Sequence, residues 1–229
     1  MSVNTYRHSA IVVMALAISL GCQGDEGAAR PQSSAENVVY TEAAHSADTD
    51  TTSVVRIAIE TSKGEFVIEV HRDWAPHGAD RFIDLVESGY YDDARFHRVV
   101  PDFIVQWGLA ANPDRTAEWA TSFIPDDPVR KSNTRGRIAY AFTDPGTRST
   151  QVFINIVDNV RLDSVGFAPF GEVVSSMNVV DSLYAGYGEN SGGGVRRGDQ
   201  SNIVRTGNLY LDREFPLLDH LERARVIRP

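Results

Sequence analysis

The feature that most constrains the fold is a series of short runs in which apolar and polar residues alternate, beginning near residue 54. Alternation is typical of a β-strand with one buried face, because successive side chains of a strand point to opposite faces. The first two runs are separated by residues 61–64, which predict the turn of a β-hairpin. The predicted strands are residues 54–60, 65–70, 96–100, 103–107, 137–142, 151–156 and 167–174.

Two segments carry apolar residues at helical spacing instead. In residues 76–89, Pro76 suits the first turn of a helix and Gly89 suits its C-terminal end. Residues 177–184 repeat the helical spacing, with Ser176 as a candidate N-cap. Many strands, two helices and no regular strand–helix alternation predict a mainly β protein, a closed antiparallel barrel with a helix at each end.

The other segments of the folded part carry weaker signals. Residues 109–135 are polar and rich in proline, and we expect a long surface loop. Residues 190–200 are rich in glycine, but no lysine–Ser/Thr pair follows, so a phosphate-binding loop is disfavoured. Residues 201–206 are a candidate for closing the sheet, and we expect residues 207–229 to be a C-terminal extension that docks on the domain.

Composition limits the classes of partner. The 229 residues carry a formal net charge of −9, which argues against nucleic acid and anionic membrane surfaces as partners. Hydrophobic residues make up 42% of the chain, so one domain with a sizeable core is expected. The single cysteine excludes an intrachain disulfide. We expect no cofactor and no metal, and we expect a monomer.

The N-terminal segment predicts export. Arg7 and His8 precede an apolar run at residues 10–20, which is too short to span a bilayer and is typical of a signal peptide. The run ends in Ile-Ser-Leu-Gly-Cys, which resembles a bacterial lipoprotein box, although Ser19 stands where leucine is usual. The resemblance implies removal of residues 1–21 and lipidation of Cys22. An ordinary signal peptide with an incidental cysteine is the alternative.

Residues 22–53 are predicted to form the lipidated cysteine and a flexible linker, because they hold too few large apolar residues to fold alone. Gln23, in place of aspartate after the cysteine, favours sorting to the outer membrane by a rule known in some bacteria. We therefore expect an exported protein of the cell envelope, lipid-anchored on the periplasmic face of the outer membrane.

An arginine and two glutamines lie among the predicted strands. Arg98 and Gln106 interrupt apolar runs, and a half-buried arginine is costly unless it is paired or functional. In residues 151–156, Gln151 and Phe153 share the face opposite to the core residues, which indicates a binding groove. A structural salt bridge of Arg98 to Asp92, Asp93 or Glu172 is the alternative. His97 is predicted to be neither a base nor a metal ligand.

These residues belong to longer motifs. Phe-His-Arg-Val-Val-Pro-Asp-Phe-Ile-Val-Gln at 96–106 is followed by Gly-Arg-Ile-Ala-Tyr-Ala-Phe at 136–142, Ser-Thr-Gln-Val-Phe-Ile at 149–154 and Gly-Phe-Ala-Pro-Phe-Gly-Glu-Val at 166–173. Over residues 54–206 the chain resembles the cyclophilin-type peptidyl-prolyl cis-trans isomerases. The resemblance implies a closed eight-stranded antiparallel barrel capped by two helices, and proline-containing polypeptides as substrates.

The resemblance also implies residue roles. Arg98 corresponds to the catalytic arginine, and Gln106, one of the groove amides, is counted with it as a catalytic residue. Ile104 stands where the family often has methionine, Phe142 and Phe167 stand where eukaryotic members have asparagine and histidine, and Arg161 stands where many members have tryptophan. The last difference puts tight cyclosporin binding in doubt. The implied substrate-binding residues are Phe103, Ile104, Ala141, Phe142, Gln151, Phe153, Leu162 and Phe167.

The expected function is therefore isomerisation of X-Pro bonds in exported proteins, assisting their folding. The alternative is a chaperone module on the same fold that grips proline segments without turning them over. A hydrolase is disfavoured, because no nucleophile and base stand at recognisable spacing.

Overall fold

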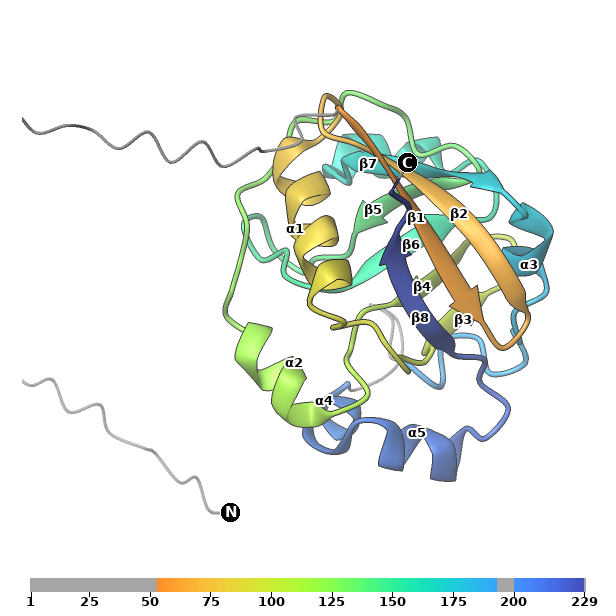
Figure 1. The fold of residues 1–229 in the computed structure, drawn as a ribbon. Coiled ribbons are helices and arrows are strands. Elements are labelled where there is room, and N and C mark those ends of the chain that lie inside the picture. Colours follow the sequence, from red (N-terminus) through yellow and green to blue (C-terminus); the bar gives the residue numbers. More distant parts are fainter. Residues whose placement is uncertain (1–52, 193–199, 229) are drawn as a thin grey trace, which may run out of the picture. The chain divides into compact units, whose positions relative to one another are not determined.

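The structure, a computed structural model, describes residues 53–192 and 200–228 (Figure 1). The predicted signal peptide (1–21), Cys22 and nearly all of the predicted linker lie outside the described residues, as does the middle of the glycine-rich loop. Within the described part of the chain, no helix is long and apolar enough to cross a membrane.

The centre of the fold is one eight-stranded antiparallel sheet with the strand order β3-β4-β6-β5-β7-β2-β1-β8 (Figure 1). The predicted hairpin is confirmed, since β1 and β2 pair from Val54↔His71 to Thr61↔Gly64. Each of the other predicted runs contains a strand. The strands are β1 Val54–Thr61, β2 Gly64–His71, β3 Arg98–Val100, β4 Ile104–Trp107, β5 Arg137–Tyr140, β6 Val152–Asn155, β7 Pro169–Ser175 and β8 Leu221–Val226.

The sheet curls strongly, but it is not the closed barrel that the sequence predicts. The end strands β3 and β8 share no strand pairing. The chain just before each of them makes one isolated bridge, Arg95↔His220, with the amide of Phe96 donating to the carbonyl of Asp219 at 3.0 Å. Because β3 has only three residues and the contact lies before it, the ladder stops short of closure.

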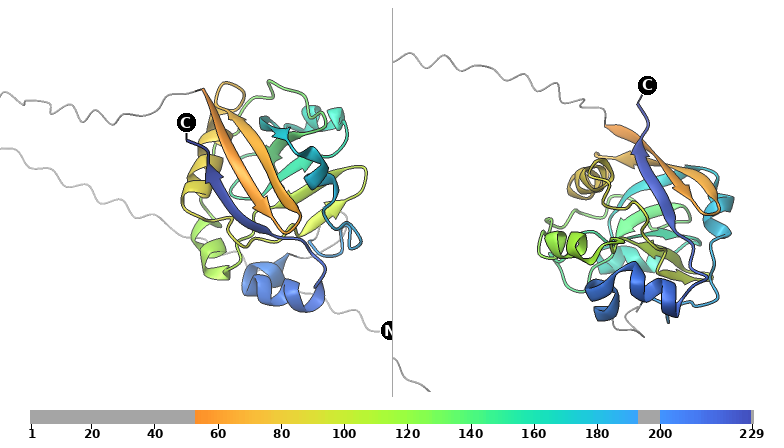
Figure 2. Two further views of the ribbon diagram at one scale, coloured as in Figure 1. Left: turned by 45° about the vertical axis from the view of Figure 1, so that its right-hand side comes forward. Right: turned by 60° about the horizontal axis from the view of Figure 1, so that its bottom comes forward.

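The last strand comes from a segment where the sequence indicated none. Residues 201–206, the candidate for closing the sheet, form the helix α4 Ser201–Thr206. β8 instead pairs with β1, from Ile57↔Val226 to Thr61↔Leu221, and Figures 1 and 2 show it along the outer side of β1. The C-terminal segment is therefore part of the sheet, rather than an extension docked on a complete barrel.

The described residues hold five α-helices, where the sequence predicted two. The two predicted ones are α1 Pro76–Glu87 and α3 Met177–Asp181, which lie on opposite sides of the sheet in Figure 1. Ser176 precedes α3 but makes no side-chain cap. The others are α2 Pro113–Trp119 in the expected surface loop, α4 and α5 Asn208–Glu214.

The prediction of a loop over residues 109–135 was wrong at α2, and the short length of this helix explains why. It has seven residues, too few for a repeated apolar stripe, and only Thr116 is buried. Its start is nevertheless encoded: Asn112 accepts a hydrogen bond from the amide of Asp114 at 2.9 Å, and Pro113 occupies the first turn.

The core lies inside the curl of the sheet, under α1. Phe82 of α1 packs against Tyr91 and Phe170, with ring centroids 5.5 and 5.1 Å apart. On β6, Val152 and Ile154 join this core, whereas Phe153 points to the other face, as the alternation predicts. The sheet therefore buries one face and leaves the other to form a binding surface.

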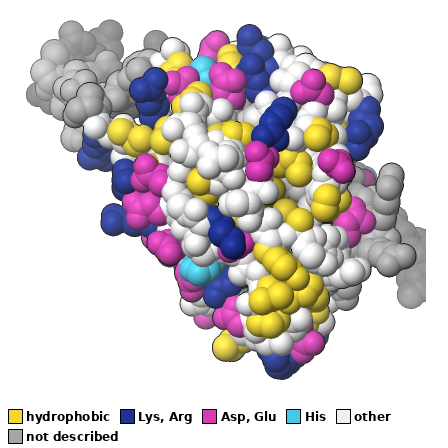
Figure 3. Space-filling model, turned by 90° about the vertical axis from the view of Figure 1, so that its right-hand side faces the viewer, with side chains coloured by type: hydrophobic (Ala, Val, Ile, Leu, Met, Phe, Trp, Pro, Cys, Tyr) yellow, Lys and Arg dark blue, Asp and Glu magenta, His cyan; other side chains and the backbone are white. Residues whose placement is uncertain are grey.

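The surface mixes charges of both signs. Figure 3 shows lysine and arginine side chains interspersed with aspartate and glutamate over one face, with hydrophobic side chains gathered near its lower end, at the height of α5. In the C-terminal segment, Leu209 and Leu217 are exposed, while Leu211, Leu218 and Leu221 are buried.

Two leucines of the C-terminal segment test whether β8 is integral to the fold. Leu221 is fully buried in the main core, so Leu221→Ala should lower the free energy of unfolding by about 2–5 kcal/mol. Leu217 is 57% exposed, and Leu217→Ala should change it by less than about 0.5 kcal/mol. Urea unfolding followed by tryptophan fluorescence measures both. Equal effects of the two substitutions would mean that β8 is a dispensable extension.

Candidate active site

Arg98 and Gln106 are brought together by the pairing of β3 with β4. The two residues are register partners, and Nη1 of Arg98 donates to Oε1 of Gln106 at 3.0 Å. Both side chains are buried, with residue exposures of 8% and 5%. A guanidinium removed from water in this way must be hydrogen-bonded, and the β3–β4 register provides that partner.

Glu189 is the second partner of Arg98, and the sequence did not indicate it. Nη2 of Arg98 donates to Oε1 of Glu189 at 2.7 Å, a charge-assisted contact. The alternative partners Asp92, Asp93 and Glu172 make no ion pair with Arg98 in the described structure. Glu189 is 91 residues away in the chain, so only the tertiary fold brings the two together.

A row of amides continues from Arg98 along the strands. Nε2 of Gln106 donates to Oε1 of Gln151 at 2.9 Å, and Nε2 of Gln151 donates to Oε1 of Gln200 at 2.9 Å. Gln200 also donates to the carbonyl of Gly192 at 2.7 Å. The row fixes which oxygen and which nitrogen each glutamine presents. The two groove amides predicted from the sequence are thus adjacent, and Gln200 is an unforeseen third.

An apolar cluster of side chains, the candidate pocket, lies beside this polar row. Phe153 of β6 is the register partner of Gln106, so the pocket floor begins directly next to the amides. The guanidinium carbon of Arg98 lies 5.5 Å from the centre of the Phe103 ring. The pocket residues form a cluster that is separate from the core: Ile104, Ala139 and Phe153 are buried, and Phe103, Ala141, Leu162 and Phe167 pack against them.

All eight predicted substrate-binding residues lie in this arrangement. Phe142 contacts Phe167, with ring centroids 4.5 Å apart, and Phe167 meets Phe153 edge-on at 5.4 Å. Gln151 lies in the amide row. Ala139 is the pocket residue that the sequence analysis missed. Its signal was present, because Ala139 and Ala141 stand two apart on one strand run and so share a face.

Hydrogen bonds from two buried asparagine side chains anchor the loop that carries Leu162. This loop contains the 3₁₀ helix η1 Val160–Val165. Nδ2 of Asn133 donates to Oδ1 of Asp163 at 2.7 Å and to the carbonyl of Phe167 at 2.8 Å, and Nδ2 of Asn159 donates to the carbonyl of Phe103 at 3.0 Å. These buried amides join Phe103 and Phe167, on two sides of the pocket, to the segments that carry Asn159 and Asn133.

Two further arginines flank the pocket. The guanidinium carbon of Arg161 lies 4.9 Å from the centre of the Phe103 ring, and that of Arg148 lies 3.9 Å from the Phe142 ring. Arg148 also pairs with Asp126 and donates to the carbonyl of Gly166. Arg161 therefore covers the Phe103 side of the pocket with a cation.

His97 lies behind Arg98 and is buried to 1% exposure. Burial lowers its pKa to about 4, because it removes water from the charged imidazolium; the Arg98 guanidinium also lowers the pKa, and Gln151 offsets part of the shift. Gly192 packs on the same histidine, since a Cβ there would lie 2.2 Å from the His97 carbonyl oxygen. His97 is a neutral packing residue at pH 7.

A guanidinium, a row of amides and an apolar cluster lie together on the outer face of the curled β-sheet. This arrangement is typical of a protein that binds a small apolar group beside a hydrogen-bond donor. The family model "Cyclophilin type peptidyl-prolyl cis-trans isomerase/CLD" matches residues 56–207. The chain belongs to this family and is a peptidyl-prolyl cis-trans isomerase. The matched range ends before β8.

Curated relatives agree with this assignment. Peptidyl-prolyl cis-trans isomerase A of Dickeya dadantii is 34% identical over 154 residues, which cover 62% of this chain and 77% of the relative. Peptidyl-prolyl cis-trans isomerase B of Escherichia coli is 33% identical over 136 residues, covering 56% and 82%. The peptidyl-prolyl cis-trans isomerase of Acinetobacter baylyi is 33% identical over 132 residues, covering 56% and 70%.

Solved structures support the fold. A crystal structure of a Cryptosporidium parvum cyclophilin-type peptidyl-prolyl cis-trans isomerase superposes with a TM-score of 0.56 at 19% identity, covering 77% of this chain and 99% of that one. A second crystal structure of that protein, in the presence of the dipeptide Ala-Pro, gives 0.56 at 18% identity, covering 76% and 99%.

The buried histidine predicts a specific pH dependence of stability. The folded protein keeps His97 neutral down to about pH 4, whereas the unfolded chain takes up the proton below about pH 6.5. The unfolded state therefore binds more protons between these values, and stability is lost as the pH falls through this window. The contribution of His97 to the loss between pH 7 and pH 4.5 should be about 2 kcal/mol.

Urea unfolding at both pH values measures this contribution. His97→Gln should reduce the loss relative to the wild type, while His77→Gln, at an exposed position, should leave it unchanged. A loss of the same size in all three proteins would show that His97 is protonated in the folded state.

Proposed function

We propose that the chain isomerises X-Pro bonds of exported proteins in the pocket beside Arg98, with Arg98 as the catalytic residue. The observation that carries this proposal is the orientation of the guanidinium. Gln106 and Glu189 hold it from two sides at 3.0 and 2.7 Å, beside the apolar cluster that contains Phe103, Ile104 and Phe153.

The chemistry needs no bond to break. Rotation about a peptide bond faces a barrier of about 18–20 kcal/mol, which amide resonance sets. At the half-rotated transition state the resonance is lost, and the prolyl nitrogen gains a lone pair that it lacks in the planar ground state. A fixed donor aimed at this nitrogen binds the transition state more tightly than the substrate, which is the condition for catalysis.

Each part of the site has a role in this scheme. Phe103, Ile104 and Phe153 grip the proline ring, while the rest of the peptide turns. The amides of Gln106 and Gln151 hold the carbonyl side, and exclusion of water strengthens each polar contact. Since about 1.4 kcal/mol of differential binding gives a tenfold rate, a thousandfold acceleration needs only about 4 kcal/mol.

Removal of the guanidinium tests the proposal. Arg98→Ala should lower kcat/KM for an X-Pro peptide by about 100–1,000-fold, the effect typical of losing one transition-state donor. Arg225→Ala, which breaks the exposed pairs with Glu60 and Glu65, should leave kcat/KM unchanged. NMR exchange spectroscopy of the peptide measures both the rate and the binding.

Two results would contradict the proposal. If the wild type binds the peptide without accelerating its isomerisation, the protein is a proline-binding chaperone module. If Arg98→Ala keeps the wild-type rate and a folded spectrum, another group is the donor.

We further propose that the protein acts in the cell envelope, lipid-anchored through Cys22 after removal of residues 1–21, as a monomer that assists folding of exported proteins. The support is the sequence of the first 22 residues. Residues 22–53 are proposed as the linker that holds the isomerase domain away from the membrane.

Mass analysis of the mature N-terminus in a bacterial host tests the anchor. We expect the first residue to be Cys22 with added acyl chains, and Cys22→Ser should release the protein into the soluble envelope fraction. A mature chain that starts elsewhere, with Cys22 unmodified, would contradict the lipid anchor without affecting the isomerase proposal.

A further inference from the structure

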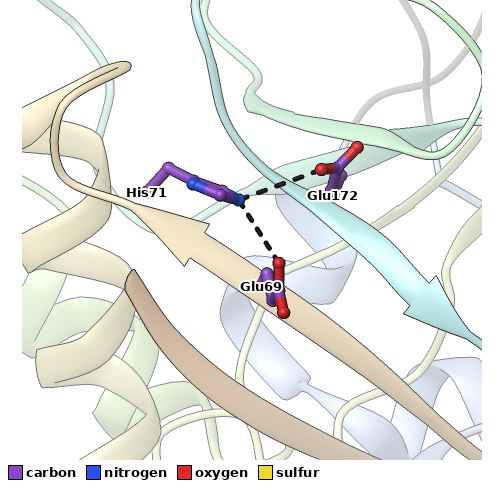
Figure 4. A group of neighbouring side chains, drawn as sticks. All are labelled: Glu69, His71 and Glu172. Carbon is purple, nitrogen blue, oxygen red and sulfur yellow. Dashed lines mark ion pairs between the residues drawn. The ribbon is translucent and has the colours of Figure 1, made fainter. Parts of the chain in front are cut away.

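A second polar cluster lies on the outer face of the sheet, where β2 meets β7, and shares no residue with the pocket. Glu69 and His71 stand two residues apart on β2 and therefore point to the same side. Glu172 of β7 is the register partner of Glu69. Figure 4 shows the three side chains converging on one point between the two strands.

The two carboxylates face each other directly across the strands, an arrangement that destabilises a sheet when nothing lies between them. Two arginines offset part of the charge. Arg56 of β1 approaches Oε1 of Glu69 at 2.7 Å, and Arg137 of β5 approaches Oε2 of Glu172 at 3.3 Å. Each carboxylate thus uses one oxygen for an arginine.

The remaining oxygen of each carboxylate is directed at His71. Nε2 of His71 lies 3.8 Å from Oε2 of Glu69 and 3.9 Å from Oε1 of Glu172. These separations are too long for direct hydrogen bonds, and this buried Nε2 has no hydrogen-bond partner. Three atoms that can each ligate a metal ion therefore face one another, and none of them is hydrogen-bonded to another.

The histidine ring is held in this orientation by its neighbours. His71 stacks on Trp74, with ring centroids 3.8 Å apart and planes 2° from parallel, and Arg137 covers the same tryptophan at 4.2 Å. On the other side of the ring, Nδ1 of His71 lies 3.9 Å from Oδ1 of Asp73. This separation is also too long for a direct hydrogen bond, so stacking on Trp74 is what orients the ring.

We propose that Glu69, His71 and Glu172 bind one divalent transition metal ion of the zinc type, with water in the remaining positions. One imidazole and two carboxylates are ligands that Zn²⁺ accepts, whereas the imidazole disfavours Ca²⁺ and Mg²⁺. The ligand atoms lie within 4.8 Å of one another. A tetrahedral centre with bonds of about 2.0–2.1 Å places its ligands roughly 3.4 Å apart, so rotations of the side chains must bring the ligand atoms closer together before they can share one ion.

Because the two arginines neutralise the carboxylates, we expect a Kd in the micromolar range. The ion would join β2 to β7.

Titration of the full chain with Zn²⁺ alone, by calorimetry and by thermal unfolding, tests the site. The wild type should bind one equivalent at this site and gain thermal stability, while Ca²⁺ should do neither. His71→Gln and Glu172→Gln should each weaken this binding at least tenfold. Arg56→Gln should strengthen it severalfold, because it removes the cation that competes for Glu69.

His77→Gln is the matched control, since His77 is exposed and lies outside the cluster. It should leave Zn²⁺ binding unchanged, and circular dichroism shows whether each variant is folded. Absence of saturable binding, or binding that survives both His71→Gln and Glu172→Gln, would overturn the proposal. Isomerase activity in the absence of metal should be the same in all of these variants, so this result is independent of the proposed function.

Discussion

The site depends on one electrostatic constraint, the burial of the Arg98 guanidinium. A charge removed from water is strongly destabilising unless hydrogen bonds replace the lost hydration. Gln106 provides one through the β3–β4 register, and Glu189 provides another from the loop that follows α3. The same two contacts that make the burial tolerable also fix the direction of the guanidinium, so stability and the orientation of the proposed catalytic donor have one structural origin.

The alternation of side chains on β6 determines which residue of this strand lies next to the polar row. Val152 and Ile154 are committed to the core, so Phe153 must lie on the groove face, next to Gln106 on β4. Asn133 and Asn159 then tie the opposite wall to the strands. The polar row and the apolar cluster consequently share one sheet, and the guanidinium carbon of Arg98 lies 5.5 Å from the centre of the Phe103 ring.

Local sequence patterns predicted the parts of the fold that depend on local physics. Period-two alternation identified seven strands, and helical spacing identified α1 and α3. β8 was missed because Leu221 and Ala224 are its buried residues, three apart, so its pattern is not that of a strand with one buried face. Barrel closure was wrongly expected because the end of a ladder is set by how far two distant edges approach, which no local pattern encodes.

In the site, too, local patterns predicted some residues, whereas residues that depend on long-range contacts were missed. The motif residues Arg98, Gln106 and Phe153 were predicted from the sequence, and the structure brings them together. Glu189, Gln200 and the Glu69–Glu172 pair were not predicted, because each depends on contacts between segments far apart in the chain. Strand register, rather than residue type, creates these interactions.

The most direct test of the central claim separates the charge of Arg98 from its fixed geometry. Arg98→Lys keeps the positive charge but cannot donate to both Gln106 and Glu189 in a rigid fork. Exchange spectroscopy on an X-Pro peptide gives its Kd and its isomerisation rate on the enzyme in one experiment. A rate about 10–100-fold lower with a nearly unchanged Kd is the result that the account predicts, because an oriented donor acts only on the twisted bond. A wild-type rate, or a loss confined to the Kd, would contradict it.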